Sequence, residues 1–420
     1  MTKPALLPMA PVDELGCYVD SPAEPNSIHL ELLLDGHLDA ARLRAAVQAM
    51  IAAHPLAMAR RAPWRAWHRR FSWEIAGEPD VTPIDDVRWR TEEELAGHRQ
   101  SLLDTAPALD LAPPLRFRHA VGQDRDVLIL NVHHAAMDGM SCLRLLRSVA
   151  RRYAGRPDPI VTDAPAPARV APVHETDRYP RRAARIAADT AEPGPGCGFH
   201  LMSLPISGSG KPTVNDVLIA ALVLAIGSWN EAHGREAGAI RIDMPINARA
   251  TAGAEEPLGN LSRLAVVTGT PAEGLLTDIT RQTTAAKVLG GPQLDAVSRL
   301  FAAPWLPVAA KARLLAVVRR LASPVVGNTS MLSNLGRVGE PPDFGPDAPA
   351  AGLWFSPPVR MPAGLALGVV TLNDRLNLCF RYRHDLLDSR TAARFTAMFR
   401  TALDSLDDPR LRSPLDSQRG

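Results

Sequence analysis

Two adjacent histidines, His133 and His134, are followed after a three-residue gap by Asp138 and Gly139. A neutral imidazole, with an ordinary pKa of about 6.5, can remove a proton from an alcohol or an amine near neutral pH. Such a base needs a hydrogen bond at one ring nitrogen, which fixes the tautomer and leaves the other nitrogen free. General-base catalysis by one of these histidines is therefore the interpretation that we favour.

Metal binding and a purely structural role are the two alternatives for this motif. Neighbouring side chains on an extended segment point to opposite faces, so only one histidine could easily join Asp138 as a metal ligand. No further cluster of His, Asp or Glu stands nearby in the sequence, and we expect no metal site. For the histidine pair taken alone, two structural histidines with satisfied hydrogen bonds remain an open alternative.

The sequence around the motif predicts that it lies between a strand and a helix. The run Asp126–Val132 is rich in branched apolar residues, as in a buried strand, and helical spacing of apolar residues begins after Ser141. Residues 115–120 are expected to pair with this strand as a hairpin. Junctions of this kind let a ligand meet both backbone and side chains, so they often carry chemistry.

Strands and helices alternate along the rest of the chain. A strand is predicted over 27–34 and a helix over 39–54, with Asp39 as its N-cap. In the second half, Thr213 is the expected cap of a buried helix, and residues 365–383 are expected to form a hairpin. The alternation lacks a strict βαβ rhythm, so the predicted fold class is α/β with mixed sheets.

The chain length indicates two domains. A chain of 420 residues is too long for one ordinary core, and its 46% of hydrophobic residues can fill two. The halves are separated by a proline-rich segment of mixed charge without a sustained apolar period. We place the N-terminal domain at 1–165, the linker at 166–198 and the C-terminal domain at 199–420.

Composition restricts the partners and the compartment. Lys+Arg 47 against Asp+Glu 45 gives a net charge of +2, so no global field favours nucleic acid or an anionic membrane. Arginines and tryptophans interleave between Arg60 and Trp73, but an exposed strand explains them better than nucleic-acid binding. The four cysteines form no CxxC pair, which argues against a zinc knuckle or a disulfide framework. Without a signal-peptide pattern, we expect a cytoplasmic protein.

A basic amphipathic helix is predicted between Trp305 and Val325, with Lys311 and Arg313 among its charged residues. Such a helix can lie on a membrane surface or pack on the core of its own protein. The two cases have the same sequence pattern. We favour packing, and membrane contact is the less favoured interpretation.

The motif and the wider layout resemble a known superfamily. His133-His134-Ala-Ala-Met-Asp138-Gly139 is similar to the HHxxxDG motif of nonribosomal-peptide condensation domains, chloramphenicol acetyltransferase, polyketide-associated acyltransferases and wax-ester synthases. The Thr213-Val-Asn-Asp-Val helix, the Met-Pro-Ile-Asn-Ala-Arg strand end, Ser-Asn-Leu-Gly and the closing hairpin and helix extend the resemblance over nearly the whole chain. It implies two chloramphenicol acetyltransferase-like subdomains in a V shape, with an active-site tunnel between them.

The resemblance also implies roles for individual residues. His134 would be the catalytic histidine and His133 a supporting residue, while Asp138 would form an ion pair that holds the loop. Gly139 would permit close approach of the backbone. Arg249 is the candidate partner of Asp138, although an arginine from the N-terminal third and a solvated Arg249 remain alternatives.

Ser333 and Asn334 lie where the superfamily brings C-terminal residues to the tunnel. Asn334 would orient the substrate or polarise the carbonyl group. The alternative is that Asn334 belongs to an ordinary glycine-containing turn.

The predicted function is that of an acyltransferase with a histidine general base. It would move an acyl group from a thioester to an alcohol, forming an ester in secondary-metabolite or lipid biosynthesis. The donor would be acyl-CoA or a phosphopantetheinyl carrier protein, with no permanently bound cofactor. We expect a monomer that acts as a stand-alone enzyme. A free-standing condensation enzyme forming an amide is one alternative, and a catalytically inactive docking or scaffold module is another.

Overall fold

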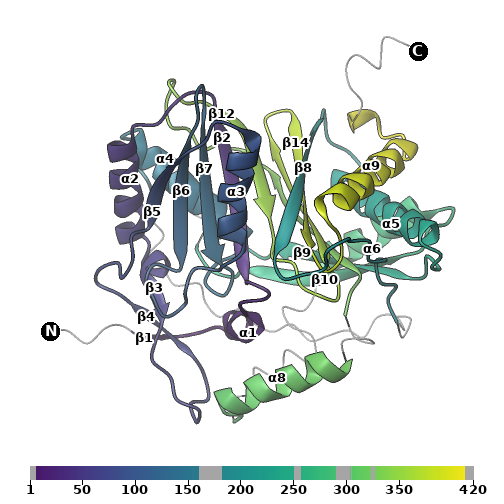
Figure 1. The fold of residues 1–420 in the computed structure, drawn as a ribbon, viewed down its shortest axis with the longest axis horizontal. Helices are drawn as coiled ribbons and strands as arrows, with labels where there is room; N and C mark the ends of the chain where they lie inside the picture. Colours follow the sequence, from purple (N-terminus) through teal and green to yellow (C-terminus); the bar gives the residue numbers. More distant parts are fainter. Residues whose placement is uncertain are drawn as a thin grey trace.

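The computed structural model describes residues 6–159, 182–249, 257–289, 303, 305–322 and 327–411. These residues form two mixed α/β halves that lie side by side (Figure 1). Each half has a sheet at its centre, and the two sheets approach each other in the middle of the molecule. Residues 166–181 of the predicted linker lie outside the described part of the chain.

The N-terminal half is built on a five-stranded sheet in the order β12-β2-β7-β6-β5. Its strands are β12 (Ala350–Ser356), β2 (Ser27–Leu34), β7 (Asp126–His133), β6 (Leu115–Val121) and β5 (Ile84–Arg88). The predicted hairpin of β6 and β7 is confirmed as an antiparallel pair, whereas β5 runs parallel to β6. The sheet is therefore mixed, as the sequence predicts.

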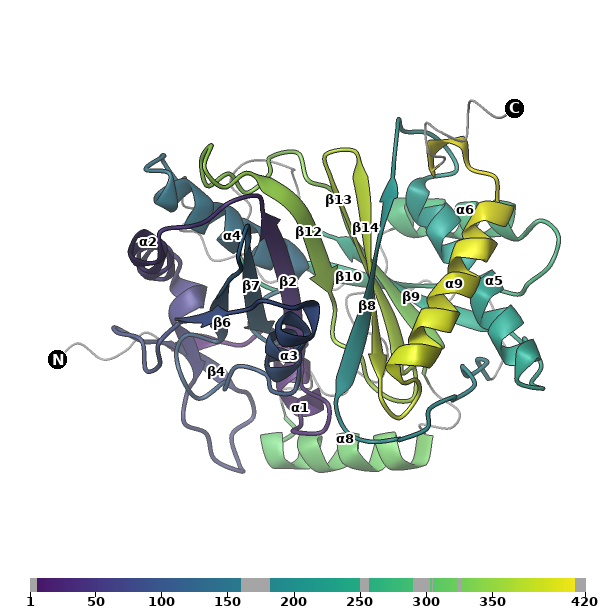
Figure 2. The ribbon, with the colours of Figure 1, turned by 45° about the horizontal axis from the view of Figure 1, so that its top comes forward.

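Helices cover both faces of this sheet. Helices α2 (Ala40–Ala53) and α4 (Gly139–Tyr153) lie on one face, and α3 (Glu92–Leu103) lies on the other (Figure 2). Asp39 caps α2 as predicted, because its side chain accepts a hydrogen bond from the Arg42 N–H at 2.7 Å. The two helix layers leave the central strands β2 and β7 almost entirely buried, whereas β5 at the edge of the sheet is largely exposed.

The C-terminal half is built on a six-stranded sheet in the order β10-β9-β11-β13-β14-β8. Its strands are β10 (Ser262–Gly269), β9 (Ile240–Asn247), β11 (Ser330–Arg337), β13 (Leu365–Leu372), β14 (Arg375–Arg383) and β8 (Cys197–Pro205). The predicted hairpin of β13 and β14 is confirmed, and β11 runs parallel to both β9 and β13. One face of this sheet carries α5 (Val214–Ala232), α6 (Leu275–Leu289) and α9 (Ser389–Ser405).

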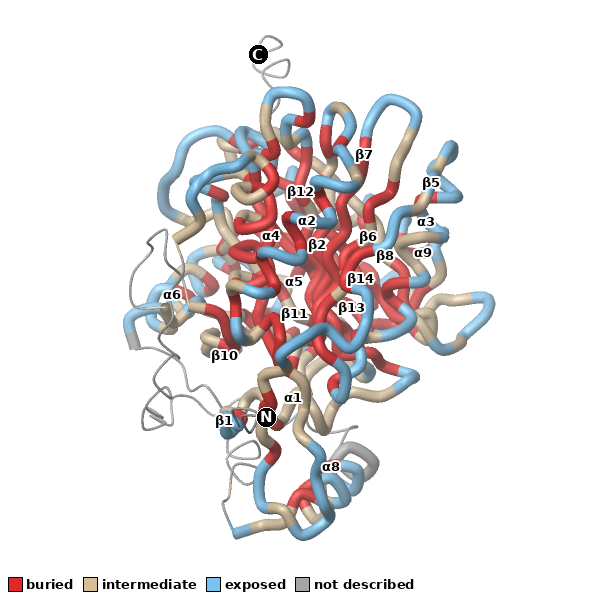
Figure 3. The backbone as a smooth tube through the Cα atoms, turned by 90° about the vertical axis from the view of Figure 1, so that its left-hand side faces the viewer, coloured by how far each residue is buried: buried red, intermediate tan, exposed pale blue. Residues whose placement is uncertain are grey.

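Helix α5 forms the centre of this second core. Thr213 caps it as predicted, since the Thr213 hydroxyl accepts from the Asp216 N–H and the Asp216 carboxylate accepts from the Thr213 N–H. Within the described ranges, α5 is the one helix long and apolar enough to cross a membrane. Because 72% of it is buried inside the protein, we interpret it as a core helix. Figure 3 shows this buried interior and the exposed loops around it.

One strand crosses between the halves. Although β12 follows β11 in the chain, it pairs antiparallel with β2 and extends the N-terminal sheet. The boundaries drawn from proline content do not anticipate this exchange, because no composition change marks it. The C-terminal half therefore contributes one strand to the N-terminal sheet. This strand lies next to β2, which pairs with β7, the strand that ends at His133.

A three-stranded sheet and two helices complete the described fold. The sheet has the order β1-β4-β3 and contains β1 (Leu6–Pro8), β4 (Ser72–Ile75) and β3 (Ala59–Arg61). The helices are α1 (Pro11–Val19) and α8 (Val308–Ala322). Short 3-10 turns cover Pro55–Met58 and Pro409–Leu411.

Helix α8 is the basic amphipathic helix expected from the sequence. Its Lys311 is fully buried, and the ammonium group lies 2.9 Å from Glu14 Oε1 on α1. It also donates to the Arg69 carbonyl oxygen at 2.9 Å. The favoured interpretation, packing on the protein's own core, therefore describes this side of the helix.

Candidate functional site

The histidine pair lies where β7 ends and α4 begins. The His133 N–H donates to the Pro114 carbonyl at 2.9 Å, and the His134 N–H donates to the Asn26 carbonyl at 2.8 Å. These bonds attach the end of β7 to the segments that flank it. The next turn of chain then reaches Asp138, which is the N-cap of α4.

His134 has the hydrogen-bond arrangement that a general base requires. Its Nδ1 lies 3.0 Å from the Met137 carbonyl oxygen, and this oxygen can only accept. Nδ1 therefore carries the proton, and Nε2 keeps its lone pair. Burial lowers the pKa of His134, and the nearby positive charge of Arg360 acts in the same direction. The imidazole is consequently neutral near pH 7.

His133 is held in the opposite tautomer. Its Nδ1 accepts a hydrogen bond from the Ala135 N–H at 3.0 Å, so the proton of the neutral ring resides on Nε2. Nε2 lies 3.4 Å from the Asp20 carboxylate. Burial on its own would raise the pKa of Asp20, but His133 and the Asn26 N–H lower it overall. The fully buried His133 thus offers no free lone pair, although its Nε2 makes no hydrogen bond within the described residues.

Asp138 and Arg249 form a bidentate ion pair between the two halves. Arg249 Nη1 lies 2.9 Å from Asp138 Oδ2, and Nη2 lies 2.9 Å from Oδ1. The Asp138 side chain is 5% exposed and that of Arg249 is 2% exposed. This is the pairing expected from the sequence, and Arg249 is not a solvated residue at a strand end.

The Asp138 carboxylate accepts three further hydrogen bonds. The donors are the Ser141 N–H and the Leu261 N–H, each at 2.9 Å, and the Ser262 hydroxyl at 3.2 Å. Burial would raise the pKa of Asp138, but Arg249 and these donors hold it below its usual range. With its oxygens occupied in this way, Asp138 braces the loop and leaves Nε2 of His134 free.

Gly139 begins α4 at a point where C-terminal segments press against the helix. A Cβ atom at this position would lie 2.8 Å from Leu335 Cδ2 and 2.8 Å from the Phe355 ring. Leu335 belongs to β11 and Phe355 to β12. The absence of a side chain at Gly139 therefore allows the close approach that was expected there.

Ser333 and Asn334 lie within β11, and the pairing of β11 with β13 becomes irregular between Asn334 and Arg337, where Gly336 has a positive φ of 78°, so the glycine-containing turn stays open as an alternative for Asn334. Asn334 Oδ1 accepts from the Gly336 N–H at 2.7 Å, and its Nδ2 lies 3.5 Å from Asn215 Oδ1 on α5. Among the described residues, no hydrogen bond joins Ser333 or Asn334 to the histidine pair or to Asp138. Their predicted substrate contacts stay a prediction.

Three polar residues of the site were not found from the sequence. Asp20 faces His133, as described above, and Asn260 donates through Nδ2 to the carbonyl oxygens of His134 (2.9 Å) and Ala135 (3.0 Å). The same group lies 2.9 Å from Asp13, whose pKa burial raises to about 6. Gly259-Asn260 is recognisable as a turn, but no sequence pattern places this turn against residues 134–135.

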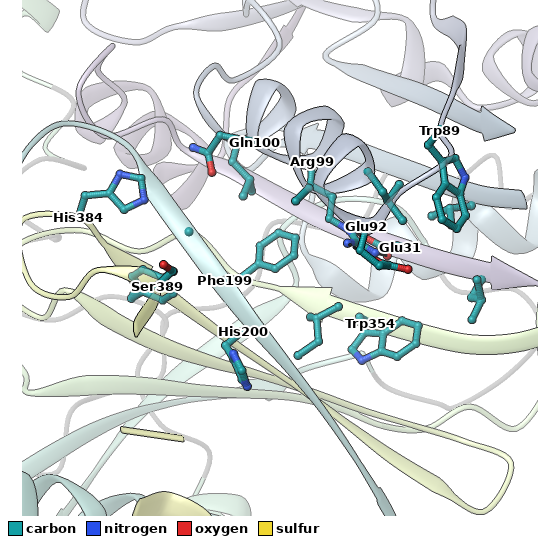
Figure 4. A pocket seen from close by; sticks show the side chains of 18 of the residues that line it. Glu31, Trp89, Glu92, Arg99, Gln100, Phe199, His200, Trp354, His384 and Ser389 are labelled. Carbon is teal, nitrogen blue, oxygen red and sulfur yellow. Dashed lines mark hydrogen bonds and ion pairs between the residues drawn. The ribbon is translucent and has the colours of Figure 1, made fainter. Parts of the chain in front are cut away.

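A cavity of about 800 Å³ lies between the two halves (Figure 4). Glu31 and Arg99 form an ion pair on its N-terminal side, with Arg99 Nε 2.7 Å from Glu31 Oε2. Aromatic side chains from both halves line it as well, namely Trp89, Phe199, Trp354 and Tyr382. Its lining combines apolar area with a few charged and polar groups, as in sites for small organic molecules.

This cavity does not include His134 in its lining, but one sheet face connects it to the motif. Ser27 pairs with His133 in the register of β2 and β7, and Glu31 follows Ser27 by four residues on the same face of β2. At about 3.3 Å per residue, the cavity wall at Glu31 lies about 13 Å along the strand from Ser27. Between them lies His29, whose ring nitrogens have no hydrogen-bond partner, although Nε2 is 3.6 Å from Glu31.

The arrangement fits proton transfer better than metal binding. Within the described part of the chain, no group of three or more His, Cys, Asp or Glu side chains is placed to hold a metal ion. His134 has its free nitrogen and its neutral state, while Asp138 is fully engaged with Arg249. The site can therefore accept a proton from a nucleophile bound beside His134.

Comparison of whole sequences finds relatives of similar length. Two strains of Mycobacterium tuberculosis carry a relative described as uncharacterized, Rv2305 in one strain and MT2362 in the other. Each is 30% identical to this chain, and the match covers 94% of this chain and 99% of the relative. Coprinoferrin synthetase of Coprinopsis cinerea is 30% identical over 161 residues, which is 36% of this chain and 6% of the synthetase. No protein-family model matches the chain.

Comparison of structures finds condensation domains. The starter condensation domain of rhizomide synthetase RzmA, in complex with C8-CoA, has a TM-score of 0.64 at 13% identity and covers 98% of this chain and 97% of that domain. The first condensation domain of the calcium-dependent antibiotic synthetase has a TM-score of 0.62 at 16% identity, over 97% and 98%. The condensation domain of the polyketide synthase MokA scores 0.59 at 11% identity, over 97% and 98%. The predicted fold, two chloramphenicol acetyltransferase-like halves, is thereby confirmed.

Proposed function

Because the chain belongs to the same family as the mycobacterial protein Rv2305 and has the fold of a condensation domain, we propose that it transfers an acyl group from a thioester to an alcohol. One observation carries the proposal: Nδ1 of His134 is occupied by the Met137 carbonyl, which leaves Nε2 as a free, neutral base. The fold supports acyl transfer or condensation in general terms. The choice of an alcohol acceptor is our own step beyond it.

In the proposed reaction, Nε2 of His134 removes the proton of the acceptor hydroxyl while the oxygen attacks the thioester carbonyl. A tetrahedral oxyanion forms and then collapses, the carbon–sulfur bond breaks, and the thiolate takes up the proton from His134. An ester and a free thiol result, and the imidazole is neutral again. Because an alcohol is far less acidic than imidazolium, proton removal accompanies attack, and positioning of the two substrates supplies much of the acceleration.

The cavity of about 800 Å³ is the proposed binding space for part of the substrate. It is large enough for a drug-sized molecule, and its aromatic walls suit an apolar or aryl group. His29 and Ser27 lie on the sheet face between this cavity and His133, and both carry buried polar atoms without hydrogen-bond partners. Such atoms are usually satisfied in a folded protein, so their presence here supports a polar path towards the motif.

The donor in this proposal is acyl-CoA or an acyl group on a phosphopantetheinyl carrier protein. The RzmA domain was solved with C8-CoA, which supports a thioester donor for a protein of this fold. No permanently bound cofactor is required by the chemistry. A monomeric enzyme in the cytoplasm remains our expectation.

The decisive experiment incubates the purified protein with a panel of acyl-CoA thioesters and small alcohols. We expect release of free thiol that depends on the alcohol, together with an ester product identified by mass spectrometry. If thiol appears at the same rate without any acceptor, the activity is hydrolysis and the proposal is wrong. If no thioester is consumed with any acceptor or carrier-bound donor, the protein is a docking or scaffold module.

An amine acceptor is the second candidate. A condensation enzyme forming an amide would use the same base and the same donor, and one of the similar structures holds C8-CoA together with Leu-SNAC. Including aminoacyl thioesters in the panel separates the two cases. An amide product in place of an ester would replace the alcohol in our proposal without changing the role of His134.

The pH dependence of the reaction follows from the environment of His134. Burial lowers the pKa of its imidazole, so the neutral base persists below the ordinary histidine value of about 6.5. We expect the acidic limb of kcat/KM to be centred below about 6.5, at the lowered pKa of His134. A pH–rate profile measured with saturating donor tests this. An acidic limb centred above about 6.5 would contradict the assignment.

A further inference from the structure

Two segments far apart in the sequence meet beside helix α8. The loop over 62–71 connects β3 with β4, and residues 305–307 lead into α8. The Val308 N–H donates to the His68 carbonyl at 2.7 Å, and the Ala309 N–H donates to the Ala66 carbonyl at 3.3 Å. The Lys311 ammonium group adds its bond to the Arg69 carbonyl. The loop and the start of α8 therefore form one continuous surface.

This surface exposes three tryptophans. Trp67 is 66% exposed, Trp305 is 65% exposed and Trp64 is 42% exposed. Tryptophan has a large apolar area that is usually buried in a folded protein. Several exposed tryptophans in one place therefore indicate a surface that binds a membrane or another molecule. Val317, 51% exposed on α8, adds an aliphatic side chain to the same helix.

The two segments that form this surface carry positive charge and contain no acidic residue. Arg65, Arg69, Arg70 and Arg313 are exposed, and the ranges 62–71 and 305–322 contain no Asp or Glu. The guanidinium group of Arg65 lies over the Trp67 ring, 5.4 Å from its centroid. Lys311 does not add to this charge, because Glu14 neutralises it. These two segments therefore carry a local excess of positive charge on a chain whose net charge is only +2.

We propose that this surface, Trp64–Arg70 with Trp305 and Arg313, binds an anionic lipid bilayer. Tryptophan is the side chain that settles at the boundary between headgroups and acyl chains, and arginine pairs with lipid phosphates. Lys311 fixes the buried side of α8 to the protein, so the helix itself does not insert into the bilayer. The hydrogen bonds of Val308 and Ala309 to the loop keep Trp64 and Trp67 beside Trp305. From the sequence, membrane contact is the less favoured interpretation of this helix. The proposal assigns that contact mainly to the exposed loop over 62–71, beside the start of the helix.

The proposal does not depend on acyl transfer, and binding alone tests it. The full-length protein is sedimented with vesicles of phosphatidylcholine and with vesicles that also contain phosphatidylglycerol. We expect binding to the anionic vesicles, weakening at high salt because exposed charges are screened. The double variant Trp67→Ala/Trp305→Ala and the variant Arg65→Gln/Arg69→Gln should each reduce the bound fraction by at least about tenfold. Tryptophan emission should shift to the blue on binding in the wild type.

One variant on the other half controls for the loss of an exposed charge and of exposed apolar area elsewhere on the protein. Arg235 and Val288 are both exposed, and Arg235→Gln/Val288→Ala should bind like the wild type. No binding to anionic vesicles, or equal binding by the tryptophan variant, would overturn the proposal. So would tighter retention of single-stranded DNA or of an acidic carrier protein by the same residues, because the surface would then serve another partner.

Discussion

Replacing His134 by alanine is expected to lower the rate of acceptor-dependent thiol release by a factor of about 100 to 10,000. The side chain supplies Nε2, the ring nitrogen that removes the acceptor proton, because the Met137 carbonyl occupies Nδ1. His133 cannot take over, since its Nδ1 already accepts the Ala135 N–H. Initial rates with purified wild type and variant, at equal donor and acceptor concentrations, give the ratio directly.

Two measurements separate a lost base from a damaged fold. Thermal unfolding should show that His134→Ala remains folded, because the histidine is only partly buried. The residual activity of the variant should no longer fall with a histidine pKa at acidic pH, which a structural role would not predict. His98→Ala, which changes a histidine on α3 whose Nε2 bonds to the Arg88 carbonyl and which does not line the cavity, should keep the wild-type rate. Full activity in His134→Ala would remove the general base from the mechanism.

Local sequence signals predict much of the fold. Asp39 and Thr213 cap their helices because their side chains accept from backbone N–H groups within the next turn. The β6–β7 and β13–β14 hairpins join strands that are close in sequence, so apolar patterns and turn residues suffice to find them. The motif at 133–139 is local as well, which explains why its position at a strand–helix junction was predictable.

Contacts between residues that are far apart in the chain cannot be predicted from local sequence signals. Strand β12 leaves its own half to pair with β2, and no local sequence signal indicates this pairing. Asn260 of the C-terminal half and Asp20 of the N-terminal half both reach the motif from segments more than a hundred residues away in the chain, and no sequence pattern places either of them against it. Burial and hydrogen bonding of these residues depend on the docking of whole elements. A single sequence does not encode that docking at any one position.

Arg249 is the exception among the long-range contacts, because the resemblance offered it as one candidate partner of Asp138. Its removal has a large expected effect on stability. Arg249→Met should lower the free energy of unfolding by about 3–5 kcal/mol, since it leaves the carboxylate of Asp138 buried without its counter-charge. The loss should also loosen the contact of residues 138–141 with 259–262. Urea unfolding of wild type and variant measures the difference, provided that both transitions are cooperative.

The pH dependence of this loss has a definite sign. The folded-state pKa of Asp138 lies below its unfolded value, so the ion pair stabilises the fold above about pH 4. As the pH falls below that value, protonation is favoured in the unfolded chain and the contribution of the pair disappears. The stability gap between wild type and Arg249→Met should therefore narrow as the solution is acidified.

A double-mutant cycle distinguishes the pair from its surroundings. Asp138→Asn leaves Arg249 without its charged partner, and the double variant should be less destabilised than the sum of the two single changes. Arg249→Lys should recover only part of the stability, because an ammonium group cannot form the bidentate contact. Arg235→Met, at an exposed position, should change the stability by less than about 0.5 kcal/mol. Additive single effects would show that Asp138 and Arg249 act independently, and that the two halves are held together by other contacts.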